Sequence, residues 1–360
     1  MTTIKHTGAV RVLLILTCLV VIMAGIKTAS NILIPFLLSV FIAIMCNPLV
    51  TKAEQYKVPK ALAIVLIIAL FVGIGMTLAG LIGNSLNELS LLMPEYKAQI
   101  TQKFAGLIDK LADYNINVSS KLLVQYLDPS AAMGFAADML SGFGGIMANV
   151  FLILLTVVFM LFEASSISGK LHLALKDPEM KIERIDRFLT SVNQYVAIKT
   201  WVSLLTGTLV SVMLWVIGLD FFILWGVLAF LFNYIPNIGS IIAAVPAVLL
   251  AFVQFDPSVA LAIGAGYMVI NTVMGNMVEP RFLGKGLGLS TLVVFLSLIF
   301  WGWLLGTVGM LLSVPLTMII KIALESSEEG KWLAVMLGDE DEVEDKLKPE
   351  NELKTDNEPS

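Results

Sequence analysis

Six polar or charged side chains lie within the strongly apolar second half of the sequence, and their types could support solute binding or proton exchange. They are Asn233, Asn237, Asn271, Asn276, Glu279 and Arg281. A charge at mid-bilayer costs about 2.5–3.5 kcal/mol on insertion scales, so such groups usually pair or line a watered cavity. Amides suit an uncharged hydroxylated solute, whereas a carboxylate can bind and release protons. Amides in a membrane also serve as contacts between helices, so the residue types alone leave packing open.

The backbone around the first two asparagines favours a binding role over packing. The stretch NYIPNIGS (233–240) interrupts two apolar runs, and a second Gly- and Pro-interrupted segment lies at 302–315. Two such interruptions are typical of the binding region of a secondary transporter, because irregular backbone at membrane depth needs protein or a watered cavity beside it. We expect the chain to unwind at 233–240 and to leave peptide groups free for a solute. The expected substrate path comprises Asn233, Pro236, Asn237, Gly239, Asn271 and Asn276.

The segment GNMVEPRFLGKGLG (275–288) follows the last two asparagines and carries charge and flexibility together. Its acidic and basic side chains form either an interfacial pair at a helix end or a pair that gates or couples transport. The gating or coupling residues that we expect are Glu279, Pro280 and Arg281. The hinge candidates, which would let one hairpin shift against a scaffold, are Gly284, Gly286 and Gly288.

The composition requires a membrane to position these residues. The chain is 58% hydrophobic and 14% charged, with a mean hydropathy of +0.88, which excludes an ordinary soluble globule. A span needs about 20 mainly apolar residues, and such stretches recur along most of the sequence. We predict an all-α polytopic membrane protein with about eight membrane segments, some of them re-entrant or broken, and a small extramembrane helical cap.

Charge distribution predicts the orientation of the chain. The short loop TKAEQYKVPK (51–60) is basic, and such loops remain in the cytoplasm. A first helix, a short break at 27–31 and a second helix precede this loop, so the N-terminus is two crossings away and is also expected in the cytoplasm. The run 287–320 is too long for one crossing and should bend back as a hairpin, which places the C-terminus on the same side.

The predicted organisation has six parts. They are N-terminal transmembrane helices that form a scaffold (1–83), a periplasmic amphipathic helical region (84–145), a transmembrane helix (146–163), a cytoplasmic helical loop (164–199), a transport core with broken segments (200–324), and an acidic disordered tail (325–360).

Residue patterns for other chemistries are missing from the sequence. It contains no G-x-x-x-x-G-K-[ST] phosphate loop, and the glycines near residue 286 lack a surrounding β-α-β pattern. Cys18 and Cys46 lie inside apolar runs, where a thiol behaves as a small hydrophobe. His6 and His172 are far apart. We therefore expect no enzyme activity, catalytic residue, metal site, cofactor or nucleic-acid binding.

Three stretches resemble the autoinducer-2 exporter family of bacterial inner-membrane proteins. They are CNPLV (46–50), FNYIPNIGS (232–240) and the region from NMVEPRFLGKGLGLS (276–290) to SVPLT (313–317). The P-x-I-G pattern falls on Pro236, Ile238 and Gly239, and the E-P-x-x-x-G-x-x-x-G-L pattern begins at Glu279. The likeness runs from the first span to about residue 325 and leaves out the acidic tail.

This resemblance implies export of autoinducer-2, a small polar sugar-like signal of quorum sensing, across the inner membrane. It also implies a homo-oligomer, for which a pentamer is our working hypothesis. Members of the family have been connected with Na⁺ or Li⁺/H⁺ exchange as well, so an antiporter is the alternative function.

Two rival hypotheses can be distinguished by geometry. An antiporter would bind protons at Glu279, Asp220 or Asp256, and carboxylates buried in the hydrocarbon zone would favour it. A membrane scaffold or regulatory subunit would be a continuous packed bundle without a cavity near residue 237.

Overall fold

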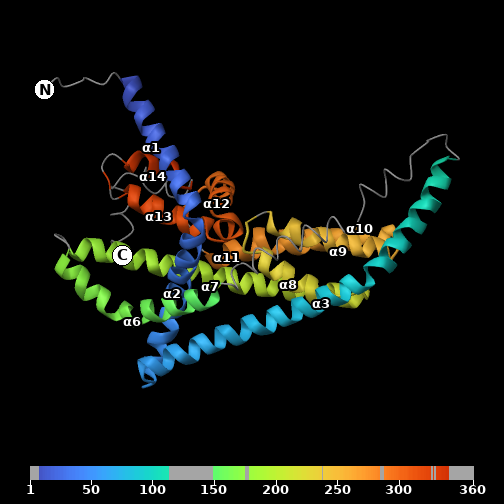
Figure 1. The fold of residues 1–360 in the computed structure, drawn as a ribbon, viewed down its shortest axis with the longest axis horizontal. Helices are drawn as coiled ribbons and strands as arrows, with labels where there is room; N and C mark the ends of the chain where they lie inside the picture. The colour runs from blue at the N-terminus through green and yellow to red at the C-terminus, as the bar shows by residue number, and fades with distance from the viewer. Residues whose placement is uncertain are drawn as a thin grey trace, which may run out of the picture.

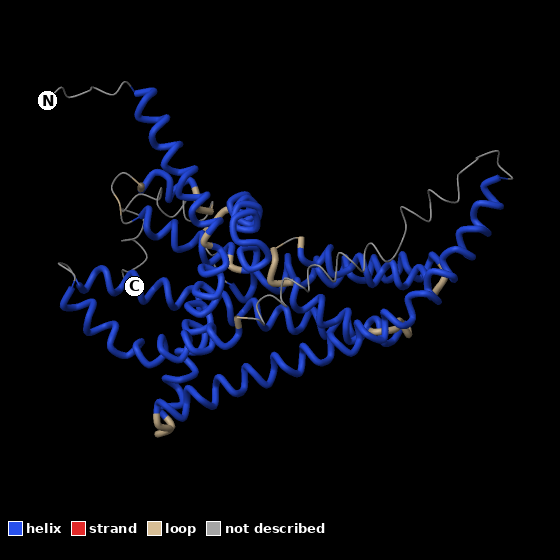
Figure 2. Tube along the Cα trace, viewed as in Figure 1, coloured by secondary structure: helices blue, strands red, loops and turns tan. Residues whose placement is uncertain are grey.

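The protein is described by a computed structural model that covers residues 8–112, 149–174, 178–236, 238–283, 288–325, 327 and 330–339. Every regular element in these ranges is a helix (Figure 1 and Figure 2). Five helical stretches are long and apolar enough to cross a membrane, and four shorter apolar helices accompany them. The all-α polytopic prediction is therefore confirmed. Residues 113–145 of the predicted cap, residues 146–148 of the predicted transmembrane helix after it, and residues 340–360 of the acidic tail lie outside the described ranges.

The first two helices differ from the expected pair of crossings. Only Ala29 separates α1 (Gly8–Thr28) from α2 (Ser30–Gln55), and its φ of −83° and ψ of 3° are close to helical values. The chain therefore does not reverse at 27–31, and Figure 1 shows α2 leading on from α1. The break was expected because the sequence there is polar, but polar residues alone do not turn a helix back.

The helix that follows is longer than the sequence predicts. α3 (Lys60–Ala112) has 53 residues, or about 80 Å at 1.5 Å per residue, far more than the ~30 Å hydrocarbon core. The expected boundary at residue 83 thus falls inside one helix, because neither Gly83 nor Pro94 breaks it. The predicted amphipathic face is real: Leu89 and Tyr96 are buried in the main core, and Leu86 and Met93 pack against it.

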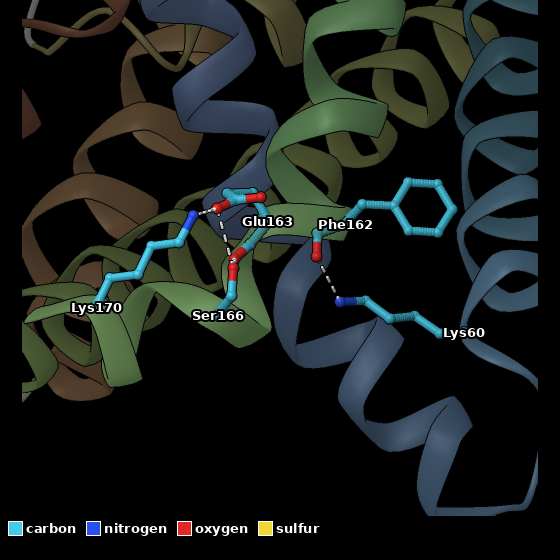
Figure 3. Close-up of polar contacts among 5 residues, drawn as sticks. All are labelled: Lys60, Phe162, Glu163, Ser166 and Lys170. Atoms are coloured by element: carbon cyan, nitrogen blue, oxygen red, sulfur yellow. Dashed lines mark hydrogen bonds and ion pairs between the residues drawn. The ribbon is translucent and has the colours of Figure 1, made fainter.

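The two basic regions that were predicted to be cytoplasmic meet at one end of the protein. Lys60, at the start of α3, donates a hydrogen bond from Nζ to the carbonyl oxygen of Phe162 in α6 (Val150–Ala174) at 3.0 Å (Figure 3). The next residue of α6, Glu163, accepts hydrogen bonds from Ser166 and Lys170. The loop around residue 57 and the polar half of α6 therefore lie on the same side, as the sequence predicts.

The centre of the molecule is a helical hairpin held against a long helix. α7 (Pro178–Ile217) leads through a tight turn into α8 (Phe222–Phe232), which is followed by α9 (Gly239–Gln254) and α10 (Pro257–Val273). α8 has 11 residues, or about 17 Å, so it cannot cross a bilayer alone. We call α8 and α9 the central hairpin and residues 233–238 its tip. A Cβ on Gly207 of α7 would lie 2.6 Å from the carbonyl oxygen of Gly226 in α8, so both glycines permit this close approach.

The C-terminal part folds back on itself as predicted. A π-helical turn, η1 (Met274–Val278), and α11 (Glu279–Leu283) end the α10 rod, and α12 (Thr291–Leu311), α13 (Ser313–Glu325) and α14 (Lys331–Met336) follow. Gly306 adopts a φ of 65° and a ψ of −149° and interrupts α12. The indole of Trp301 donates to the Thr317 hydroxyl at 3.0 Å across the hairpin. The bend in the run 287–320 is therefore confirmed.

The far end of the central hairpin, opposite the tip, is fastened to α3. Lys103 Nζ donates to the carbonyl oxygens of Phe252, Val253 and Phe255 at 3.3, 2.6 and 2.7 Å. These carbonyls belong to the last turn of α9 and its C-cap, where a cation is favourable because it offsets the helix dipole and the unpaired carbonyls.

We expect Lys103→Met to loosen this end. The last turn of α9 would lose its cation, and amide hydrogen exchange at residues 252–258 should rise by about tenfold, corresponding to roughly 1–2 kcal/mol for charge-assisted hydrogen bonds. Lys103→Arg should retain the protection, because it keeps a donor of the same charge. Unchanged exchange in the methionine variant would show that α9 is capped without Lys103.

Candidate solute cavity

The tip of the central hairpin is a series of tight turns with satisfied peptide groups. The N–H groups of Asn233, Ile235 and Gly239 donate to the carbonyl oxygens of residues 229, 232 and 235 at 3.0, 2.8 and 3.2 Å, and Ile238 donates to Pro236 at 2.6 Å. The helix is interrupted at the tip, as expected, but the N–H groups of its described residues are bonded locally. They therefore offer no free donor to a solute.

Gly239 makes this compact tip possible. A Cβ at this position would lie 1.8 Å from the carbonyl oxygen of Phe232 and 2.7 Å from its carbonyl carbon. The start of α9 thus rests directly on the backbone at the end of α8. The predicted Gly239 is a close-packing residue of the turn, and it does not line the cavity described below.

Two side-chain hydrogen bonds fix the tip at the middle of α7. Asn233 donates from Nδ2 to the Ser203 hydroxyl at 2.9 Å, and the Tyr234 hydroxyl donates to Thr200 at 2.8 Å. The apolar stretch of α7 runs from Leu189 to Ile217, so Ser203 is at its midpoint. The tip therefore lies beside the membrane-spanning part of α7 and not beside its ends.

A buried ion pair lies next to the tip. Lys199 Nζ on α7 approaches both carboxylate oxygens of Glu279 at 2.8 and 2.9 Å. The two side chains are 6% and 17% exposed. Each charge in such a place needs the other, because removing one partner leaves an uncompensated charge in apolar surroundings. The pair joins α7 to the start of α11, directly after η1.

A cavity of about 700 Å³ adjoins both the tip and the ion pair. It runs between α9 and α10, and volumes of about 300–1,000 Å³ are usual for small-molecule sites. Its walls are apolar toward the far end and polar toward the tip. The polar lining residues are Lys199, Asn233, Ser240, Tyr267, Asn271, Thr272, Asn276 and Glu279.

Most of the predicted path residues meet at this cavity. Asn233, Pro236, Asn271 and Asn276 line it, as does Glu279 from the predicted gating group. Asn233 is also a contact between helices through Ser203. The side chains of Asn271 and Asn276 make no hydrogen bond to any residue in the described ranges.

The remaining predicted residues fall elsewhere. Asn237, Gly284 and Gly286 lie outside the described residues. Pro280 and Arg281 are exposed on α11, and the partner of Glu279 is Lys199 rather than Arg281. Gly288 has a φ of 64°, and its carbonyl oxygen accepts a hydrogen bond from Lys321. The carboxylates proposed for proton exchange, Asp220 and Asp256, are exposed at the far end.

Sequence analysis missed three contributors to the site, Lys199, Ser203 and Tyr267. Lys199 was assigned to the end of a cytoplasmic loop, although it follows the apolar residues Tyr195 and Val196 and precedes a long apolar run. A lone lysine inside such a periodic stretch is a usable signal for an intramembrane ion pair. A serine or a tyrosine in an apolar helix carries no comparable signal.

Comparison with known proteins identifies the kind of molecule to which this cavity belongs. The family model described as "AI-2E family transporter" matches residues 16–329. The chain belongs to the AI-2E transporter family. The match covers every described element that lines the cavity, and it ends before the acidic tail.

Individual relatives in the AI-2E family agree over nearly the whole chain. The AI-2 transport protein TqsA of Escherichia coli K12 is 44% identical over 332 residues, which are 92% of this chain and 96% of TqsA. A putative transport protein of Haemophilus influenzae is 44% identical over 335 residues, 91% of this chain and 96% of that protein. The putative transport protein YhhT of Escherichia coli K12 is 41% identical over 327 residues, 91% and 94% of the two chains.

The family assignment confirms the predicted resemblance and the function class. This chain is a multi-pass membrane transporter, and its relatives are named as transport proteins. The scaffold hypothesis loses its main support, since the central hairpin borders a cavity and does not pack as a continuous bundle.

Proposed function

We propose that this transporter exports autoinducer-2, a small polar sugar-like solute, across the bacterial inner membrane. The observation that carries the proposal is the pair of cavity amides, Asn271 and Asn276, that lie within an apolar stretch and bond to no described residue. Amides that served as contacts between helices would be paired. The name of the relative TqsA, an AI-2 transport protein, supports this choice of solute.

The electrostatics of the cavity support a neutral solute over an ion. Lys199 and Glu279 neutralise each other at one end, and the remaining polar lining groups are amides and hydroxyls. Uncharged donors and acceptors suit hydroxyl groups, and a net charge would suit Na⁺ or H⁺ better. Of the three carboxylates considered for proton exchange, Asp220 and Asp256 are exposed, which argues against the antiporter alternative. Glu279 is the buried one, and it is paired with Lys199.

Reconstitution tests the proposal directly. The full-length protein in liposomes should move labelled autoinducer-2, and runs with and without a proton gradient report the driving force. Transport of Na⁺ or Li⁺ against protons with no movement of autoinducer-2 would establish the antiporter instead.

We expect Asn271→Leu to lower autoinducer-2 transport by about tenfold at equal membrane abundance. The substitution removes one hydrogen-bonding group from the cavity and replaces it with an apolar side chain of similar size, a net loss of about 0.5–1.5 kcal/mol. Asn84→Leu on the exposed face of α3 is the matched control and should transport normally. Equal rates for both variants would remove Asn271 from the path.

The oligomer and orientation belong to the same proposal. We propose a homo-oligomer in which the basic loop near residue 57 and the polar half of α6 face the cytoplasm, because these two regions lie together and basic loops remain inside. The expected cytoplasmic N-terminus loses its basis, because α2 leads on from α1 without the reversal that two crossings require. Exposed residues such as Ile241 and Met268 also border the cavity, so a second copy could close it. Native mass spectrometry tests the homo-oligomer, and cysteine labelling from each side of the membrane tests the orientation.

A further inference from the structure

Tyr267 on α10 carries a hydroxyl for which the described residues supply no partner. The residue lines the cavity and is 2% exposed, and its hydroxyl oxygen bonds to nothing in the described part of the chain. Of the buried side-chain oxygens described, only the Ser313 hydroxyl shares this condition, and Ser313 does not line the cavity. A buried unsatisfied hydroxyl costs about 1–3 kcal/mol, and phenylalanine would fill the same space without that cost.

Neighbouring hydroxyls show that partners are otherwise available in this part of the molecule. Thr200 and Thr206 donate to carbonyl oxygens one turn earlier in α7, at 2.7 and 2.8 Å. Ser203 accepts from Asn233, and Tyr234 donates to Thr200. The unpaired Tyr267 hydroxyl is therefore an exception to a local pattern in which hydroxyls are bonded.

Of the polar side chains that line the cavity, Tyr267 lies nearest the far end, and Asn271 follows about one helical turn closer to the tip. The lining nearest the far end comes from Val248, Leu249, Gly264 and Met268. The ion pair is at the opposite end, about 18 Å away along the helix if 12 residues separate Tyr267 from Glu279 at 1.5 Å each. A solute held only at the tip would have no hydrogen-bonding contact at this end.

The wall beside Tyr267 leaves room for its ring. Side chains on a helix lean toward the preceding turn, and the residue three positions earlier is Gly264. A Cβ at Gly264 would touch only Val248, at 3.7 Å, so this stretch of wall is not crowded.

We propose that the Tyr267 hydroxyl is a specificity-determining contact that hydrogen-bonds a hydroxyl group of the transported solute. This inference rests on the proposed function and deepens it: the cavity selects a solute with two polar groups, one for Asn271 and one for Tyr267, which are about 6 Å apart along α10. In the empty protein the unpaired Tyr267 hydroxyl contributes an unfavourable free energy. A solute that hydrogen-bonds the hydroxyl removes this contribution, and an apolar solute does not.

The test is Tyr267→Phe in the full-length protein, reconstituted in nanodiscs and measured by calorimetric titration with autoinducer-2 and by thermal unfolding. We expect the Kd to rise by about tenfold, the effect of one hydrogen bond, while the unfolding midpoint stays the same or rises. Tyr96→Phe is the matched control. Its hydroxyl already has a partner, Asp220 at 3.0 Å, and it does not line the cavity, so its midpoint should fall and its Kd should stay within about twofold.

Each outcome has one meaning. An unchanged Kd in Tyr267→Phe with normal binding by the unsubstituted protein overturns this inference alone. A lower midpoint in Tyr267→Phe also overturns it, because the hydroxyl would then be satisfied in the empty protein. If the unsubstituted protein does not bind autoinducer-2, the proposed function fails and this inference fails with it.

Discussion

Replacing Lys199 by Met or Glu279 by Gln should each destabilise the protein by about 3–5 kcal/mol and abolish transport. Each substitution leaves one charge without its partner beside an apolar stretch of α7, which is the costly case for a buried pair. The double variant Lys199→Met/Glu279→Gln should recover most of the stability, because replacing both charges by side chains of similar volume is often neutral. Equilibrium unfolding of the purified protein in mixed micelles measures all three.

The exposed pair Glu163–Lys170 supplies the matched control. Its side chains are 51% and 68% exposed and lie in the polar half of α6 (Figure 3). Exposed pairs contribute about 0–1 kcal/mol, so Lys170→Met should leave both stability and transport nearly unchanged. Similar losses for Lys170→Met and Lys199→Met would show that burial does not set the effect.

Transport by the double variant shows whether the Lys199–Glu279 pair is needed only for stability or also for transport. We expect the stable double variant to remain inactive, because the cavity would lose the charged donor and acceptor beside the tip. Normal transport would assign the pair a purely structural role. A double variant as unstable as the single variants would contradict the direct coupling of the two charges.

Replacing Gly239 by Ala should have the second largest effect, a loss of about 2–3 kcal/mol or more together with most of the transport activity. The new Cβ would lie 1.8 Å from the Phe232 carbonyl oxygen, and overpacking of this kind costs about 1–3 kcal/mol when side chains can yield. Here the obstacle is backbone, so α8 and α9 must move apart at the tip. Cavity residues on both helices would then shift.

Gly80→Ala is the control for this substitution. No atom lies within 4 Å of a Cβ built at Gly80, and alanine is favoured over glycine in a helix by about 1 kcal/mol. Its unfolding midpoint and transport should therefore equal or exceed those of the unsubstituted protein. A harmless Gly239→Ala would mean that the tip opens without cost, contrary to the packing described.

Local hydrophobicity and helix-breaking residues made much of the fold predictable. Apolar runs predict helices in a membrane, and breakers such as Gly306 predict where the run 287–320 bends. The interruption at 233–240 predicts a hairpin tip near the solute path, because few proteins place proline and two asparagines between apolar helices without a purpose. The cavity amides Asn271 and Asn276 were identified by the same argument, since polarity within an apolar run is conspicuous.

The extent of the helices was less predictable. A helix continues while each next residue can form its i→i−4 hydrogen bond, and both apolar and amphipathic sequences satisfy this condition. Lys60 to Ala112 changes from an apolar to an amphipathic pattern without a breaker strong enough to stop it, so the boundary expected at residue 83 lies inside one helix. The reversal of the chain expected at 27–31 is absent for the same reason, since no residue there is a strong helix breaker.

The sequence by itself determined that this protein dissolves in a bilayer, that its helices are interrupted at 233–240 and within 302–315, and that amides accompany the first interruption. Only the tertiary structure decided that Lys199 pairs with Glu279, that the described N–H groups of the tip bond locally, and that no described residue bonds the Tyr267 hydroxyl. The physical reason is range: hydropathy and turn chemistry act between neighbours in the chain, whereas the pairing of a buried charge or hydroxyl depends on which distant helix is packed beside it.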